Sequence, residues 1–328
     1  MSRSAKAHLL LVFITVLWGM TFVQIKAALN YISPLSFNLF RMTIAAAAMC
    51  LIFHKNLAQL TVKSARAGAI VGFFLWLGYE FQTTGLKYTT PSKSAFLTGI
   101  CVVLVPLLLA LFFRRHVNRW ITFGALIAFA GLYLMAFPAH GSRTFDLSRI
   151  NVGDLLSLGC AVCFAFQIIL IGRATQKYAF RQIATVQIVV CAILMAVVDP
   201  VVKTAVPAVA APAITWNATL IAALLVTALL CTVLAFSVQA WAQQFTPPTH
   251  AELIFSMEPV FAAVASWWFL GENLGLGGGA GAGLILAGVL VSELKGSTAE
   301  EMREETATEP DESDLQASEM LTRQGKGE

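Results

Sequence analysis

Charged residues are scarce in this 328-residue chain, at 12% of the sequence, whereas hydrophobic residues make up 58%. A typical soluble domain carries about 25% charged residues, because its helices and strands each need one polar face. The mean hydropathy of +0.75 reflects more apolar surface than a water-soluble fold can bury. These values exclude an ordinary soluble domain and indicate a protein embedded in a lipid bilayer.

The sequence also lacks the usual motifs for phosphates and metals. It contains no phosphate-binding loop and no metal-ligating cluster, so we expect no cofactor, no metal site and no ATP-driven step within the chain. All six cysteines lie in apolar segments, and we interpret the CxxC pair Cys160 and Cys163 as small buried thiols. The Lys and Arg residues stand in short gaps between apolar runs, which is typical of membrane topology signals and not of nucleic-acid binding.

Long hydrophobic runs are the feature that the chain has in abundance. A helix needs about 20 apolar residues to cross a bilayer, and the runs predict an all-α integral membrane protein with ten transmembrane helices. The predicted spans are 8–28, 34–53, 65–86, 92–113, 119–138, 153–172, 182–200, 216–240, 248–270 and 276–294. The first run continues without a small-residue cleavage site, so we interpret it as an uncleaved helix and not as a signal peptide.

The distribution of Lys and Arg predicts the orientation in the membrane. With the N-terminus in the cytoplasm, the short inner segments hold 11 of these residues and the outer segments hold 6, in agreement with the positive-inside rule. An even number of spans then places both termini in the cytoplasm, and we expect a multi-pass protein of the cell (inner) membrane. Ten of the 18 acidic residues lie between Glu300 and Glu328, which predicts a disordered cytoplasmic tail.

An internal duplication relates the two halves of the sequence. Residues 78–97 align with residues 235–254 at an offset of 157, which places Gln82 on Gln239. The same offset aligns two glycine-containing segments near the ends of the two halves. Because each half holds five spans, an odd number, the second half enters the membrane upside down. Inverted repeats of this kind are typical of transporters, with a binding site near the middle of the bilayer.

The duplication divides the chain into units. They are a cytoplasmic N-terminus (1–7), a first five-helix repeat (8–138), an outer connection (139–152), a second five-helix repeat (153–294) and the acidic tail (295–328). Two inverted five-helix repeats are therefore the predicted architecture.

Several short segments follow one another in a characteristic order along residues 8–294. They are LWGMTF at 17–22, Arg41, GLKYTTPSKSAFLTG at 85–99, VLVPLL at 103–108, MEPVFAA at 257–263, Gly271-Glu272 and GLILAGVLVS at 283–292. Their order, spacing and duplication resemble the EamA type of the drug/metabolite transporter superfamily. The resemblance implies a ten-helix bundle with both termini cytoplasmic, a central cavity, and export of amino acids, related metabolites or drugs.

Polar and aromatic side chains within the spans are the candidates for function, because ionisable groups are costly in a bilayer. The candidates for substrate binding are Trp18, Phe22, Arg41, Trp76, Tyr79, Glu80, Gln82, Gln239 and Glu258. Arg41 and Glu258 fall near the middle of their predicted spans, so they either pair or face a shared aqueous cavity. Pro106 and Pro259 are candidates for gating, because a proline frees a carbonyl and bends a helix.

Each candidate also has a structural interpretation. The charged residues can form an ion pair without touching substrate, the glutamines can bond neighbouring helices, and the aromatic residues can pack against them. Glu80 has three interpretations: a carrier of protons, a binder of cations, or a residue reaching the outer membrane interface.

The patterns together predict a secondary transporter that exports small metabolites by alternating access, and no enzymatic activity. The alternative within transport is a nucleotide-sugar or phosphometabolite exchanger, which requires several Lys or Arg residues facing the cavity. An intramembrane enzyme and a non-transporting scaffold are alternatives of another class. The expected partners are the lipid bilayer, a small-molecule substrate, protons, and a second copy of the chain packed through helices five and ten.

Overall fold

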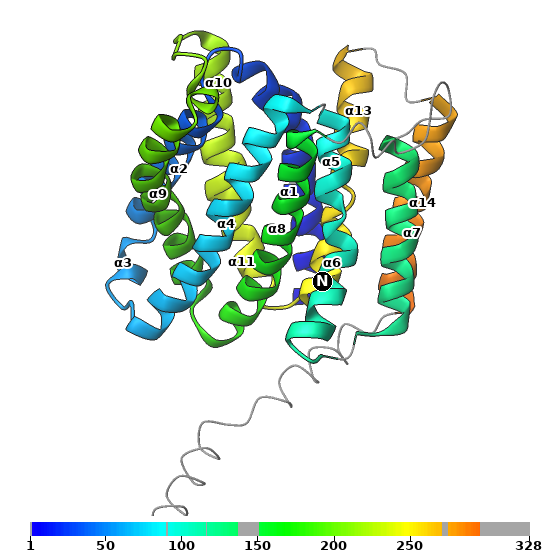
Figure 1. The fold of residues 1–328 in the computed structure, drawn as a ribbon. Helices are drawn as coiled ribbons and strands as arrows, with labels where there is room; N and C mark the ends of the chain where they lie inside the picture. Colours follow the sequence, from blue (N-terminus) through cyan, green and yellow to red (C-terminus); the bar gives the residue numbers. More distant parts are fainter. Residues whose placement is uncertain (1, 90, 116, 137–150, 271–274, 296–328) are drawn as a thin grey trace, which may run out of the picture.

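The computed structural model describes residues 2–89, 91–115, 117–136, 151–270 and 275–295. Across these residues the chain forms helices and no β-strand (Figure 1). The helices are α1 (Arg3–Ala28), α2 (Pro34–Ile52), α3 (His54–Leu57), α4 (Val62–Tyr88), α5 (Pro91–Gly99), α6 (Cys101–Phe112), α7 (Arg119–Ala136), α8 (Val152–Lys177), α9 (Phe180–Ala205), η2 (Pro207–Ala210), α10 (Ala218–Leu225), η3 (Val226–Leu234), α11 (Ala235–Ala242), α12 (Pro248–Phe255), α13 (Glu258–Leu270) and α14 (Gly275–Lys295). Most of the predicted outer connection and of the predicted acidic tail, together with Gly271-Glu272, lies outside the described residues.

Short polar motifs explain where several of these helices begin. At α2 the side chain of Ser33 accepts a hydrogen bond from a backbone N–H of the first turn, which satisfies one of the free donors at a helix start. At α4 and α8 the pairs Thr61/Ser64 and Asn151/Asp154 form reciprocal capping boxes. The turn residues between the apolar runs therefore set the helix boundaries.

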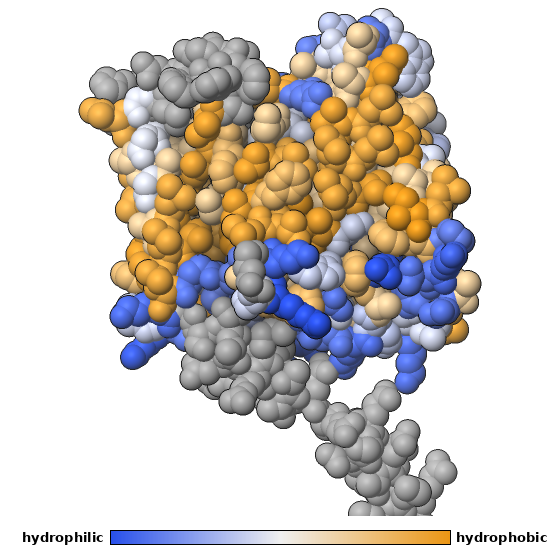
Figure 2. Space-filling view, turned by 180° about the vertical axis from the view of Figure 1, so that it is seen from behind, coloured by the Kyte–Doolittle hydropathy of each residue, from blue (hydrophilic) through white to orange (hydrophobic). Residues whose placement is uncertain are grey.

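Seven helical segments in the described residues are long and apolar enough to cross a membrane. They are Arg3–Ala28, Pro34–Ile52, Ser94–Phe112, Val152–Lys177, Phe180–Ala205, Ala218–Ala242 and Gly275–Lys295. Figure 2 shows a broad apolar band across one face of the molecule, with hydrophilic residues gathered along the edge where the N-terminus lies. Leu51, Phe112 and Val201 expose 76%, 67% and 66% of their surface, and such side chains face lipid at low cost. The chain is an integral membrane protein.

Two segments that the sequence predicts as continuous spans are interrupted. The helix pair α5 and α6 is interrupted at Ile100, and the pair α12 and α13 at Ser256 and Met257. Ile100 and Met257 are 157 residues apart, which is the offset of the internal duplication. A third span changes its winding, because α10 continues into α11 through the π-helical segment Val226–Leu234.

Helices α7 and α14 pack against each other through glycines. A Cβ atom on Gly124 would lie 2.5 Å from the carbonyl oxygen of Gly288, and a Cβ on Gly288 would lie 2.5 Å from that of Gly124. Gly131 and Gly281 approach in the same reciprocal way, at 2.5 and 2.6 Å. The two backbones can come this close only because these positions carry no side chain.

Helix α4 lies between α8 and α9 and carries one face toward the middle of the bundle. A Cβ on Gly78 would meet the ring of Phe164 on α8, and a Cβ on Gly72 would meet the backbone of Gln187 on α9. At its far end the Lys26 ammonium donates to backbone carbonyls of residues 86, 87 and 89, which satisfies free acceptors at the helix end. These contacts fix the rotation of α4 about its axis.

Candidate functional site

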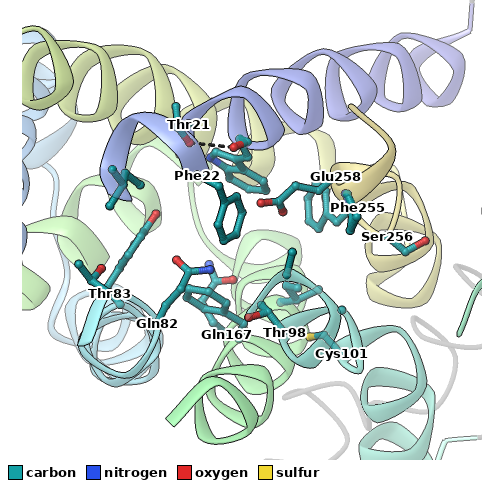
Figure 3. Close-up of a pocket in the computed structure, with 18 of the residues that line it drawn as sticks. Thr21, Phe22, Gln82, Thr83, Thr98, Cys101, Gln167, Phe255, Ser256 and Glu258 are labelled. Carbon is teal, nitrogen blue, oxygen red and sulfur yellow. Dashed lines mark hydrogen bonds between the residues drawn. The ribbon is translucent and has the colours of Figure 1, made fainter. Parts of the chain in front are cut away.

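A cavity lies in the middle of the bundle, beside both helix interruptions (Figure 3). Its walls come from α1, α2, α4, α8 and α11 and from the two interrupted pairs, α5–α6 and α12–α13. Its water-accessible volume is about 110 Å³, several times the roughly 10–15 Å³ that a single water molecule needs. The cavity can therefore accept a small solute.

Aromatic rings form one wall of the cavity. The ring centroid of Trp18 lies 5.7 Å from that of Phe236 and 5.1 Å from that of Phe255. Trp18 Nε1 donates a hydrogen bond of 3.0 Å to the carbonyl oxygen of Cys231, and Phe22 lies one turn further along α1. Because the indole is held at both its ring and its N–H, this wall has a fixed shape.

Arg41 of α2 is buried beside the cavity and held by two hydroxyl groups. Its Nε donates to Thr232 Oγ1 at 2.9 Å, and its Nη2 donates to Tyr79 Oη at 3.0 Å. The guanidinium carbon also lies 4.5 Å from the centroid of the Tyr79 ring, a cation–π distance. Thr232 Oγ1 in turn donates to the carbonyl of Thr227, five residues earlier, so the π-helical winding presents this hydroxyl to Arg41.

Two carboxylates on the interrupted pair α12–α13 complete the site. Glu258 is the first residue of α13, keeps part of its surface open to the cavity, and projects into it between Phe22 and Phe255 in Figure 3. Glu252 of α12 lines the same cavity and is 4% exposed. No ion pair joins Glu258 to Arg41 in the described residues. Both residues line the cavity.

Glutamine side chains form the opposite side of the cavity. Gln239 Nε2 donates to Gln167 Oε1 at 3.3 Å, and Gln167 Nε2 donates to Gln187 Oε1 at 3.2 Å. Gln82 is half-buried and lies next to Gln167 in Figure 3. These amides provide donors and acceptors opposite the carboxylates.

Most of the residues that the sequence singled out meet at this cavity. Its lining includes Trp18, Phe22, Arg41, Tyr79, Gln82, Gln239, Glu258 and Pro259. Trp76, Glu80 and Pro106 do not line it. Trp76 packs within the apolar core beside Phe73, Pro106 lies within α6 beyond the interruption at Ile100, and Glu80 hydrogen-bonds to Asn38 of α2.

Six hydroxyl, amide or carboxyl side chains in the lining were not among the predicted candidates: Thr21, Thr83, Thr98, Gln167, Glu252 and Ser256. For Gln167 the available signal was an amide within an apolar run. Glu252 also offered a signal, as an ionisable side chain within a predicted span, but its place near the predicted inner end of that span disfavoured it. The hydroxyl groups, including that of Ser256, offered none. In the part of the chain that the structure describes, no group of three or more His, Cys, Asp or Glu side chains is arranged to hold a metal ion.

A membrane-embedded helical bundle with a central cavity at interrupted helices is the architecture of a membrane transporter. The EamA-like transporter family matches residues 5–137 and 151–294. The chain belongs to this family, whose members are transporters and generally not enzymes.

Relatives with known sequences agree with this assignment, and a solved structure shares the fold. An uncharacterized transporter of Archaeoglobus fulgidus is 33% identical over 289 residues, which are 88% of this chain and 86% of that protein. The uncharacterized transporter YdfC of Bacillus subtilis is 28% identical over 170 residues, about half of each chain (50% and 53%). One crystal structure superposes with a TM-score of 0.68 over 88% of this chain and 97% of its own, at 18% identity, a likeness of fold.

Proposed function

We propose that this chain is a secondary transporter that exports small metabolites by alternating access between two inverted five-helix repeats. The observation that carries the proposal is the position of the cavity at both helix interruptions. Secondary transporters bind substrates at discontinuous helices near the bilayer midplane. An aromatic wall, carboxylates and amides around one cavity of this size suit a small polar solute with an apolar part.

Ten spans follow if three further segments cross the membrane with the seven long apolar helices. These are α4, α7 and the interrupted run α12–α13. The 27 residues of α4 extend about 40 Å and the 18 residues of α7 about 27 Å at 1.5 Å per residue. Both lengths suit a hydrocarbon core of about 30 Å.

Reciprocal contacts support the inverted relation of the repeats. At the offset of 157, Gly124 corresponds to Gly281 and Gly131 corresponds to Gly288. The close contacts join Gly124 to Gly288 and Gly131 to Gly281, which is the crossed pattern that a two-fold axis produces. The matched interruptions and the two separate family matches point to the same division, into 8–138 and 153–294.

We place the protein in the inner membrane with both termini in the cytoplasm. The excess of Lys and Arg in the predicted inner segments, 11 against 6, supports this orientation. The hydrophilic rim in Figure 2 lies at the same end as the N-terminus. A homodimer through α7 and α14 would use the outward face of α14, where Gly279 and Gly283 have no neighbour within 4 Å in the described residues.

The charges at the cavity favour a solute with an ammonium group, such as an amino acid or an amphipathic amine. Among the described lining residues Arg41 is the one Lys or Arg side chain, and its hydrogen bonds go to Tyr79 and Thr232. Glu252 and Glu258 contribute two carboxylates, and aromatic faces attract organic cations. A phosphorylated substrate needs several cationic donors, which disfavours the nucleotide-sugar exchanger.

The experiment that tests the proposal is solute counterflow in liposomes. Purified protein is reconstituted into vesicles loaded with unlabelled solute, and uptake of the labelled solute is followed for amino acids, quaternary amines and sugar phosphates. We expect counterflow of at least one ammonium-bearing solute above protein-free vesicles. Counterflow of the sugar phosphates alone would support the exchanger, and none with any solute would contradict a transporter of this class.

A further inference from the structure

Two buried carboxylates lie behind the cavity, where α4 packs against α2 and α9. Glu80 of α4 is 8% exposed and Asp199 of α9 is 1% exposed. Helices α4 and α9 run side by side, since a Cβ on Gly68 would meet Val186 and a Cβ on Gly72 would meet Gln187 and Val190. Both residues lie about 10 Å below the ends of their helices at Tyr88 and Ala205, at 1.5 Å per residue. The pair is separate from the lining of the cavity.

Each carboxylate has one oxygen without a donor. Oε2 of Glu80 and Oδ2 of Asp199 are buried and accept no hydrogen bond from any group in the described part of the chain. Two neighbouring carboxylates that are both charged repel each other and lose their hydration. Protonation of either carboxylate removes one of the two charges and so lowers this cost.

The neighbouring amide indicates a proton and not a metal ion. Asn38 Nδ2 donates to Glu80 Oε1 at 3.2 Å and to the carbonyl oxygen of Tyr79 at 3.1 Å. Because a backbone carbonyl can only accept, the atom of Asn38 that faces Glu80 is its nitrogen. The amide oxygen is turned away and accepts from Thr83 Oγ1 at 2.9 Å. A hard cation such as Ca²⁺ or Mg²⁺ requires a shell of about six oxygens, and here the amide presents a donor instead.

We propose that Glu80 and Asp199 together carry one proton, bound to one or the other carboxylate, and that this proton is the coupling ion of transport. The proposal rests on the transport function proposed above. A proton from water bonds to an oxygen of one carboxylate, which becomes neutral, and its release to water restores the charge. Among the described residues, the other charged or titratable groups that act on the pair are Lys203 and the Cys191 thiol, both on α9. Lys203 Nζ donates to Ser36 Oγ of α2 at 2.9 Å.

A short chain of contacts connects the pair to the cavity. Asn38 bonds both Glu80 and the backbone of Tyr79, and the Tyr79 hydroxyl accepts from Arg41 at the cavity. Loss or gain of the charge on Glu80 changes the strength of its bond to Asn38, since bonds to charged groups are about twice as strong. A change in protonation therefore alters the packing of α4 against α2 and α9. Tyr79, on the same helix α4, holds Arg41 at the cavity.

The test uses the full chain in liposomes and measures two fluxes of one transported solute: accumulation driven by a pH gradient, and counterflow without a gradient. In the unchanged protein we expect the pH gradient to drive accumulation. Glu80→Gln and Asp199→Asn should each lower that accumulation at least tenfold and leave counterflow within about twofold. Asp154→Asn, which changes a buried carboxylate in the cap of α8, is the matched control and should keep both fluxes.

Two further variants cover the case in which the neutral variants do not fold. Lys203→Met removes the positive neighbour, so the pH of half-maximal accumulation should move upward. Glu80→Asp keeps an acid and should retain pH-driven accumulation. Accumulation driven by a sodium gradient and not by pH, a neutral variant with unchanged pH response, or a Lys203→Met protein with an unchanged midpoint would overturn the proposal. Absence of all flux in the unchanged protein would instead contradict the transport function itself.

Discussion

Arg41 illustrates how a buried charge is accommodated in this bundle. Its guanidinium is bound by the hydroxyls of Thr232 and Tyr79 and lies against the Tyr79 ring. This arrangement leaves Glu258 facing the cavity without forming an ion pair with Arg41 in the described residues. A carboxylate that is not neutralised by the protein is available to a cationic solute.

A double-mutant cycle on Arg41 and Tyr79 tests this arrangement. Arg41→Met and Tyr79→Phe should each lower the thermal stability of the purified protein, because a hydrogen bond to a charged group contributes about 1.5–3 kcal/mol. Their effects should be non-additive by about 0.5–3 kcal/mol. A cycle on Arg41 and Glu258, measured by the same thermal denaturation, should show a smaller coupling. Equal or larger coupling with Glu258 would contradict the observed contacts.

Glu258 should distinguish solutes by charge. Glu258→Gln keeps the size of the side chain and removes its charge, so binding of an ammonium-bearing solute should weaken at least tenfold, about 1.4 kcal/mol. Binding of an uncharged analogue should change by less than about threefold. Calorimetric titration of the detergent-purified protein measures both. Equal losses for the two solutes would mean that the residue shapes the cavity and does not recognise charge.

At the scale of the helices, the two interruptions and the π-helical segment present polar groups to the cavity. In an ordinary α-helix the hydroxyl of Thr232 and the carbonyl of Cys231 would point elsewhere. In the wider π-helical winding, the hydroxyl faces Arg41 and the carbonyl faces Trp18. The interruption before Glu258 similarly starts a new helix at the cavity wall.

The close packing of α7 on α14 should depend on the absence of a side chain at the contact glycines. Gly124→Ala would place a Cβ 2.5 Å from the carbonyl oxygen of Gly288 and should destabilise the protein by about 1–3 kcal/mol, as overpacking does. Gly283→Ala, on the same helix pair with nothing within 4 Å in the described residues, is the control. Thermal denaturation in detergent compares the two. Equal stability of both variants would rule out the close contact.

The sequence predicts the helical elements well and their rotation poorly. The position of a helix follows from the run of apolar residues, which can be read directly from the sequence. The predicted spans 8–28 and 216–240 therefore lie close to α1 and to the run Ala218–Ala242. Which side of a helix faces a cavity depends on packing with its neighbours. Tyr79 and Glu80 are adjacent in sequence but about 100° apart around α4, and the structure places one at the cavity and the other behind it.

At the scale of the whole molecule, the proposed topology places the two ends of the helical bundle on opposite sides of the membrane. Single cysteines are introduced at Gln59, between α3 and α4, and at Ala205, at the end of α9, in a cysteine-free background; both positions are exposed. A membrane-impermeant thiol reagent should label position 205 in intact cells and position 59 only after permeabilisation. The reverse pattern would invert the proposed orientation.

Transport by alternating access requires that the cavity open in turn to the two sides of the membrane. Thr98, on α5 just before the interruption at Ile100, lines the cavity, so Thr98→Cys in a cysteine-free background reports on access from either side. The decisive measurement is the rate at which an impermeant thiol reagent labels this cysteine in right-side-out and in inside-out vesicles. We expect labelling from both sides, slowed in each case by a transported solute. Labelling from one side alone, or from both sides without any effect of solute, would contradict alternating access through this cavity.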